Sequence, residues 1–278
     1  MLLARRLLPH GWTDLLRQLV LFCGAYWLYR IVRGIADGRA AAAFQNARHV
    51  IRLEHALGLF VEPAVQTWAA GKEWLIDLAS WTYLNSHFTV TVFTLAWIYL
   101  FRNERFYFVR NMFMVAMAIA LIGYALYPTA PPRLMPEWGF TDSVADFTGI
   151  SDNGSVSFLV NPFAAVPSMH VCFALMLGVP MSRIVRRSWA RALWTVYPAM
   201  VTFVVVATAN HWVFDAITGA LTALVSAAIA TTVFARARLA DRRMTDSATR
   251  GINHLVCGPD GHATGRAPAA RRAPQQRP

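Results

Sequence analysis

Residues 167–215 read PSMHVCFALMLGVPMSRIVRRSWARALWTVYPAMVTFVVVATANHWVFD. His170 and His211 each open an apolar stretch, and the forty residues between them hold two apolar runs. The basic segment 182–187 separates those runs. If both runs cross a membrane, two crossings return the chain to the side that it left. The two imidazoles are then predicted to face each other at one depth, on one face of the membrane.

The composition is that of a polytopic membrane protein. Charged residues make up 15% of the 278 residues and hydrophobic residues 56%, whereas soluble domains have about 25% charged residues. The net charge of +11 would suit a nucleic acid partner, but the arginines lie in short loops and a tail, so no nucleic acid partner is expected. Cys23, Cys172 and Cys257 have neither a disulfide pattern nor zinc spacing.

We expect an all-α bundle of six transmembrane helices, because a spanning helix needs ~20 mostly apolar residues and lipid offers the backbone no other partner. The six predicted spans are Leu15–Ile35, Trp74–Phe101, Phe106–Tyr127, Ser168–Val185, Ala192–Ala209 and His211–Ala235.

Four regions follow from this pattern. Residues 1–37 form an N-terminal transmembrane helix, which we interpret as retained because no small-residue cleavage site follows it. Residues 38–72 form an amphipathic segment on the outer face, residues 73–235 the core, and residues 236–278 a disordered basic cytoplasmic tail. The long segment 128–166, rich in Pro, Gly, Asp and Ser, is of a length that is often functional.

The segment 38–72 is open to two interpretations. Its predicted apolar face has roughly helical spacing and consists of Val50, Leu53, Leu57, Leu59, Phe60 and Val65. The first interpretation is a helix that lies on the bilayer surface, and the alternative is a role in gating access of the substrate.

The arginines predict the orientation in the membrane. The loops after the second, fourth and sixth spans are arginine-rich, and with six spans they share one side with the N-terminus. That side is predicted to be cytoplasmic, which places the histidines on the extracytoplasmic face of the plasma (inner) membrane and both termini inside. Arg30, Arg33, Arg39, Arg48 and Arg52 contradict this pattern, and Asp37, Glu54 and Glu62 only partly offset them.

His211 and Asp215 are the first candidate catalytic pair. Their i, i+4 spacing places them on one face of a helix, where a carboxylate holds one imidazole tautomer and stabilises the cation formed when the other nitrogen attacks. An aspartate inside a membrane helix is expensive and is functional by default. A structural polar pair is the plainer alternative.

His170 is the second catalytic candidate, because it follows Ser168 where a loop enters a span. Serine is a favoured N-cap, and the free amide groups of a new helix bind phosphate oxygens. His170 would then be placed to protonate a leaving oxygen. Together the two histidines favour covalent phosphoryl transfer over a passive membrane role.

Four residues are predicted to bind the substrate: Arg133, Ser168, His87 and Asn210. The guanidinium of Arg133 offers phosphate a planar fork of donors. His87 lies inside the second span, where a helix-bridging hydrogen bond and a substrate contact remain equally open. Trp212, Trp138 and Phe140 are predicted to form part of an aromatic belt at the outer boundary.

Three motifs resemble the type 2 phosphatidic acid phosphatase superfamily, and in particular its inositol phosphorylceramide synthase-like (inositolphosphotransferase-like) branch. They are YPTAPPR at 127–133, NPFAAVPSMH at 161–170 and HWVFD at 211–215. The likeness covers roughly residues 75–235. It implies that His211 forms a phosphohistidine, that His170 protonates the leaving alcohol and that Asp215 orients His211. It implies a membrane lipid substrate, a lipid or small alcohol acceptor where the group is transferred, and no metal or other cofactor.

The sequence also departs from the phosphatase branch. Leu126 and Leu134 stand where that branch has the lysine and the proline of its first motif, and Val204 and Val205 replace its Ser-Arg. Two cationic phosphate contacts are therefore missing, which favours a phosphodiester monoanion and headgroup transfer. A plain lipid phosphate phosphatase, a non-catalytic lipid-binding or transport protein and an iron site with two histidines and one carboxylate remain as alternatives.

Overall fold

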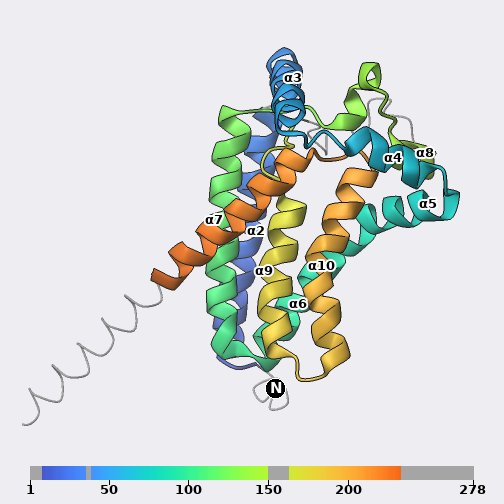
Figure 1. Ribbon diagram of the computed structural model, residues 1–278. Helices are drawn as coiled ribbons and strands as arrows, with labels where there is room; N and C mark the ends of the chain where they lie inside the picture. The colour runs from blue at the N-terminus through green and yellow to red at the C-terminus, as the bar shows by residue number, and fades with distance from the viewer. Residues whose placement is uncertain (1–7, 36–38, 150–162, 233–278) are drawn as a thin grey trace, which may run out of the picture. The chain divides into compact units, whose positions relative to one another are not determined.

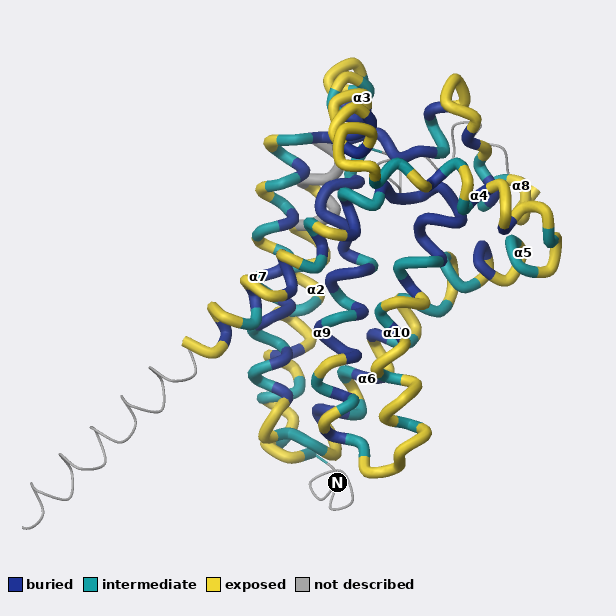
Figure 2. Tube along the Cα trace, in the orientation of Figure 1, coloured by how far each residue is buried: buried dark blue, intermediate teal, exposed yellow. Residues whose placement is uncertain are grey.

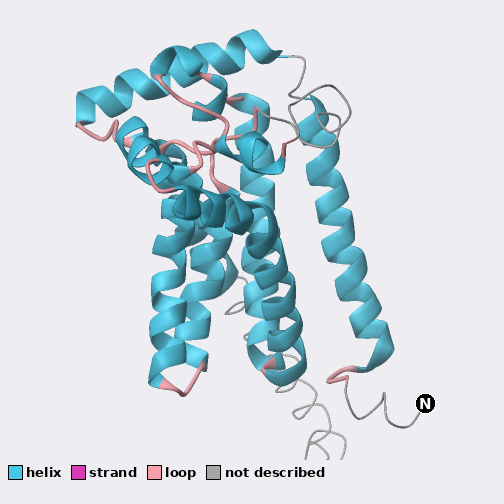
Figure 3. Cartoon of the chain, turned by 90° about the vertical axis from the view of Figure 1, so that its right-hand side faces the viewer, coloured by secondary structure: helices cyan, strands magenta, loops and turns pink. Residues whose placement is uncertain are grey.

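The computed structural model describes residues 8–35, 39–149 and 163–232. The chain divides into two compact units, residues 1–231 and 232–278, and all but the last of the described residues belong to the first unit. The predicted tail, residues 236–278, lies outside the described residues. Within the described part of the chain, helices and loops account for everything except an isolated bridge between Thr129 and Ala164 (Figure 3).

The predicted all-helical class is confirmed for these residues. The helices are α2 (Gly11–Ile35), α3 (Ala40–Leu57), α4 (Glu62–Ala70), α5 (Glu73–Trp81), the π-helical turn η2 (Thr82–Ser86), α6 (His87–Phe101), α7 (Asn103–Leu126), the short turns η3 (Pro132–Leu134) and η4 (Pro136–Trp138), α8 (Ser143–Thr148), α9 (Met169–Ile184) and α10 (Ser188–Ala207). A last helix, Val213–Thr232, follows α10.

Four of these segments are long and apolar enough to cross a membrane: Glu73–Phe101, Asn103–Leu126, Ser188–Ala207 and Val213–Thr232. The number of six spans is not confirmed. A helix forms at the first predicted span, α2, but it carries Asp14, Arg17 and Gln18 near its start. The fourth predicted span, α9, has 16 residues, about 24 Å of helix, against a hydrocarbon core of ~30 Å.

The short helix α9 packs against three other helices. It contacts α6, α7 and α10 (Figure 1), and Cys172, Met176 and Leu177 belong to the main buried cluster with residues of α7. Gly178 permits the close approach of α10, since a Cβ there would lie 2.7 Å from the Trp194 carbonyl oxygen. Because protein surrounds α9, its length does not have to match the bilayer.

The predicted amphipathic segment, residues 38–72, forms two helices, α3 and α4, and the face that packs on protein is not the predicted apolar face. The buried residues are Ala43, Ala47, Val50, Ile51 and Glu54 on α3, and Glu62, Gln66 and Ala69 on α4 (Figure 2). Leu53 and Leu57 are exposed, so they do not belong to the face of α3 that packs on protein. The buried face of α3 packs on protein, in a cluster with residues of the loops around 130–140 and 209–212.

The predicted aromatic belt is wrong for two of its three members. Trp212 and Phe140 are buried and pack edge to face, with Phe60 against both rings. The indole of Trp212 donates to the Ala130 carbonyl oxygen at 2.9 Å. The ring therefore ties the loop after α7 to the start of the last helix instead of contacting headgroups. Trp138 keeps partial exposure.

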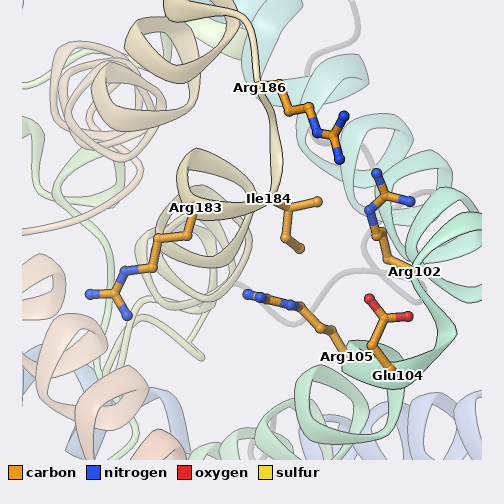
Figure 4. Close-up of a pocket in the computed structure, with 6 residues that line it drawn as sticks. All are labelled: Arg102, Glu104, Arg105, Arg183, Ile184 and Arg186. Carbon is orange, nitrogen blue, oxygen red and sulfur yellow. The ribbon is translucent and has the colours of Figure 1, made fainter.

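Arginines gather at the end of the helices away from the two histidines. The α6–α7 turn and the end of α9 line one cavity of about 250 Å³ with Arg102, Glu104, Arg105, Arg183, Ile184 and Arg186 (Figure 4). Two of the loops that the arginine pattern predicts on one side of the membrane therefore do lie together. None of its lining residues is a histidine, so the cavity is separate from the His170–His211 pair.

Candidate active site

The structure brings the two predicted catalytic histidines into contact. His170 lies in the first turn of α9 and His211 immediately precedes the last helix. His170 Nδ1 and His211 Nε2 are 3.3 Å apart, and the two rings meet edge to face. The expectation from two crossings, that both imidazoles return to the same depth, holds in this geometry.

Asp215 contacts the opposite side of the His211 ring. Its Oδ2 lies 3.2 Å from His211 Nδ1 and accepts from the Trp212 backbone N–H at 2.9 Å. The second bond is the return half of a capping box, in which the third helical residue bonds the backbone of the N-cap. Because Nδ1–H donates to the carboxylate, the lone pair of His211 lies on Nε2, the nitrogen that faces His170.

The surroundings of His211 are largely closed to water. His211 and Asn210 are nearly buried and Asp215 is fully buried. Tyr127 follows the end of α7 and lies near the same site. Burial, and then the charge of Asp215, raise the pKa of its hydroxyl. A low-dielectric surrounding strengthens each electrostatic interaction at the histidine pair.

The start of α9 is held against the last helix by direct backbone contact. Ser168 is the predicted N-cap, and its side chain accepts from the Val171 N–H. Its own N–H donates to the Asp215 carbonyl oxygen at 3.0 Å. Gly219 packs so closely on the Ser168 carbonyl that a Cβ at that position would collide with it. These contacts fix the position of His170 relative to His211.

Arg133 reaches the site from η3. Its Nη1 donates to Asn210 Oδ1, its Nε pairs with Asp142 Oδ2 at 3.2 Å, and its backbone N–H donates to the Ala209 carbonyl oxygen. The guanidinium thus lies beside the residue that precedes His211, with its charge partly balanced by Asp142. Asn210 positions the guanidinium and is itself held by Thr208.

His87 approaches the site from α6. Its ring centroid lies 4.6 Å from that of His170 and 5.9 Å from that of Phe173. His87 Nδ1 is buried and has no hydrogen-bond partner among the described residues, so this nitrogen does not make the helix-bridging hydrogen bond that was one of the two interpretations of His87.

Sequence reasoning missed Tyr83, which packs on His170 together with His87. Tyr83, in the π-helical turn η2, stacks on His170 with centroids 4.8 Å apart. Single π-helical turns are frequent at functional sites, and here the turn directs Tyr83 and the following His87 at the same histidine. The spacing of four residues from His87 was the only sequence signal.

Two buried acids were also missed. Glu62 Oε1 accepts from the Val213 N–H and Glu54 Oε1 from the Phe214 N–H, each at 2.7 Å. From the sequence, both residues counted only as charges that offset nearby arginines. The signal was present for Glu54, which falls four residues after Val50 on the buried face of α3.

The alternative of an iron site finds no support in the part of the chain that the structure describes. No three His, Cys, Asp or Glu side chains there are arranged to hold a metal ion. The Asp215 oxygen that would complete a ligand set is bonded to His211 Nδ1, on the side of the ring that faces away from His170.

Comparison with known proteins identifies the family. No curated protein and no solved structure matches the chain. The family profile of the PAP2 superfamily matches residues 48–229, which is more than half of the chain and includes the second half of α3, all of α4 and the three motifs. The match begins earlier than the likeness over residues 75–235 that the motifs predict. The chain belongs to the PAP2 superfamily, that of the type 2 phosphatidic acid phosphatases.

Proposed function

We propose that this protein is a membrane phosphotransferase or phosphatase that acts on a lipid-linked phosphate through a phosphohistidine on His211. One observation carries the proposal: His211 Nδ1 is bonded to Asp215 while its Nε2 faces His170 Nδ1 at 3.3 Å. Nucleophilic catalysis needs a nucleophile that a neighbouring group orients and a second titratable group near the atom that attacks. Here Asp215 orients His211 through Nδ1, and His170 is the titratable group near Nε2.

The reaction has two steps. His211 Nε2 attacks phosphorus, so that a P–N bond forms and the P–O bond to the leaving alcohol breaks, while His170 gives its proton to that oxygen. Water or an acceptor alcohol then attacks phosphorus, His170 takes the proton of the attacking hydroxyl, and the P–N bond breaks. General acid–base help of this kind contributes about 10²- to 10⁴-fold. Neither step needs a metal ion.

Substrate binding has to part the two rings. A near-attack geometry places the reacting atoms about 3–3.5 Å apart, and the 3.3 Å between the two nitrogens leaves no room for a phosphoryl group between them. His170 contacts Tyr83 and His87 by ring packing. A rotation of the His170 ring along Tyr83 and His87 opens the space for the phosphoryl group. Arg133 and Ser168 then lie beside that space and bind phosphate oxygens.

The charge of the site favours a phosphodiester and headgroup transfer of the inositol phosphate type over a monoester. Leu126 points to the surface and Val204 and Val205 are buried, so these three positions supply no cation to the site. Arg133, the one arginine at the histidine pair among the described residues, is partly balanced by Asp142. A monoanionic diester needs less positive charge than a dianion. Hydrolysis of a lipid phosphate is the alternative that product analysis distinguishes.

We also propose that the histidines face the outside of the plasma (inner) membrane. Arg102, Arg105, Arg183 and Arg186 line the cavity at the opposite end, and arginine-rich short loops stay in the cytoplasm. In intact cells, a cysteine replacing exposed Glu137 should react with a membrane-impermeant maleimide and one replacing Arg186 should not. The reverse labelling pattern would refute this orientation.

The mechanism is tested by trapping the intermediate. Purified protein is incubated with a panel of lipid phosphates and phosphodiesters that carry radiolabelled phosphorus, and the reaction is quenched in base and in acid. Wild type and His170→Ala should retain a base-stable, acid-labile label, and His211→Ala should retain none. His49→Ala, a change at an exposed histidine of α3, is the matched control and should behave like wild type. Turnover without any protein-bound label refutes the covalent route, and no turnover on any lipid favours a non-catalytic lipid-binding protein.

A further inference from the structure

Three carboxyl groups converge on the start of the helix that follows His211. The first backbone N–H groups of a helix have no partner within it. Here the N–H groups of residues 212, 213 and 214 donate to Asp215 Oδ2, Glu62 Oε1 and Glu54 Oε1 at 2.9, 2.7 and 2.7 Å. Asp215 belongs to the same helix, whereas the two glutamates come from α3 and α4, more than 150 residues earlier.

Both glutamates are buried, and neither is paired with a cation among the described residues. Glu54 is 1% exposed and Glu62 is 0% exposed, and the ion pairs of the described residues include neither. Burying one unpaired carboxylate is expensive, and two side by side repel each other as well. The positive end of the helix dipole and the backbone N–H groups stabilise one negative charge better than two.

A proton held between the two carboxyl groups resolves this conflict. The second oxygens, Glu54 Oε2 and Glu62 Oε2, are buried and have no hydrogen-bond partner among the described residues, while the first oxygens accept from the adjacent N–H groups of residues 214 and 213. Burial, and then the charge of Glu62, raises the pKa of Glu54 to about 9. At neutral pH Glu54 therefore keeps the proton, and a carboxyl oxygen of Glu62 can accept it in a hydrogen bond.

We propose that Glu54 and Glu62 form a proton-sharing carboxyl pair that positions the nucleophile, because the pair locks α3 and α4 onto the first turn of the helix that carries Asp215. This inference rests on the function proposed above. The His211–Asp215 bond and the approach of His211 to His170 both depend on where that turn lies. A displacement of about 1 Å at a reacting group can lower the rate by about 10²-fold. Both glutamates are positioning residues, and neither contacts phosphorus.

The proposal predicts that shape and hydrogen bonding matter at position 54, while negative charge does not. Glutamine is the neutral analogue of a protonated glutamic acid: its oxygen can accept from the Phe214 N–H and its amide can donate to Glu62. Glu54→Ala removes both bonds and leaves the Phe214 N–H buried without an acceptor. Glu54→Asp keeps the carboxyl group but shortens the side chain by one methylene, which moves the carboxyl away from the Phe214 N–H.

The experiment combines hydrogen exchange with kinetics on the full-length protein in detergent or nanodiscs. In Glu54→Ala, the amides of residues 213 and 214 should exchange about tenfold faster or more, as expected when a buried hydrogen bond is lost. Its kcat should fall about 10- to 100-fold, with KM within about threefold of wild type. Glu54→Gln should restore slow exchange and bring kcat back to within about threefold. Glu73→Ala, at an exposed acid of α5, is the matched control.

The outcomes separate this inference from the proposed function. If Glu54→Ala exchanges and turns over like wild type, the positioning role is wrong. If Glu54→Gln is as impaired as Glu54→Ala, the charge is needed and the shared proton is wrong. Where Glu54→Ala does not fold, Glu54→Asp replaces it, with the same faster exchange expected and the same refutation. If wild type has no activity on any lipid, the proposed function fails, while the exchange measurements still decide whether the pair holds the helix.

Discussion

Replacing Asp215 by asparagine tests the geometry of the nucleophile most directly. One oxygen, Oδ2, accepts from both the Trp212 N–H and the His211 Nδ1–H, and Oδ1 is buried without a partner among the described residues. The amide oxygen of asparagine can take the place of Oδ2 and keep both bonds. The amide nitrogen cannot take that place, because it is a donor and would face the Trp212 N–H, which is also a donor. The substitution should therefore preserve the His211 tautomer and remove only the charge.

The expected magnitude follows from this orientation. A hydrogen bond to a charged group contributes about 1.5–3 kcal/mol, and each 1.36 kcal/mol in the barrier is tenfold in rate. The kcat of Asp215→Asn should then fall by about 10- to 100-fold. In serine protease triads, where asparagine enforces the wrong tautomer, the loss is about 10⁴-fold. The amide NH₂ left at the buried Oδ1 position should lower the free energy of unfolding by about 1–3 kcal/mol.

The assay is single-turnover formation of the labelled phosphoprotein by rapid quench, alongside steady-state kcat and thermal unfolding. Asp77→Asn, at an exposed acid of α5, is the matched control and should change neither rate. If kcat falls by less than about threefold, Asp215 has no role in the mechanism. A fall beyond about 10³-fold with an intact fold would mean that the tautomer has changed, and the shared-oxygen geometry would be wrong.

Three further predictions concern the surroundings of the pair. Gly219→Ala should lower the Tm and destabilise the fold by about 1–3 kcal/mol, because its Cβ meets the Ser168 carbonyl. Arg133→Lys should raise the KM for a lipid phosphodiester about 10-fold with little change in kcat, because lysine cannot hold Asn210 and Asp142 together and still present a planar fork. The folded state holds the Glu54 proton up to a pKa of about 9, while the unfolded chain releases it near 4.5. Glu54 should therefore lower the free energy of unfolding as pH rises between these values, and the wild type should lose more stability than Glu54→Gln over that interval.

Each of these predictions has an internal comparison. Gly24→Ala, where no atom lies within 4 Å of the new Cβ, should leave the Tm in place, and equal effects of the two glycine changes would refute the close contact. Arg48→Lys changes an exposed pair with Glu137 and should leave KM alone. For the pH dependence, the groups that face Glu54 are Glu62 and Asp215, and parallel stability curves for wild type and Glu54→Gln would contradict the raised pKa.

The sequence by itself determined the parts of this protein that follow from local rules. The contact between His211 and Asp215 and the serine N-cap before His170 depend on residues within four positions of each other, and both appear in the structure, although His211 lies just before the helix and not on it. The meeting of the two histidines was predictable because two apolar runs of similar length return the chain to one level. Arginines in short loops predicted which loops would lie together at the far end, and the Arg102–Arg186 cavity agrees.

Only the tertiary structure decided which side chains complete the site. Glu54 and Glu62 cap a helix more than 150 residues away, Tyr83 packs on His170, and Trp212 is buried instead of facing headgroups. An exposed and a buried carboxylate look alike in a sequence, because burial depends on neighbours that are distant along the chain. Periodicity and capping are properties of consecutive residues, whereas the surroundings of a side chain are set by how whole helices pack.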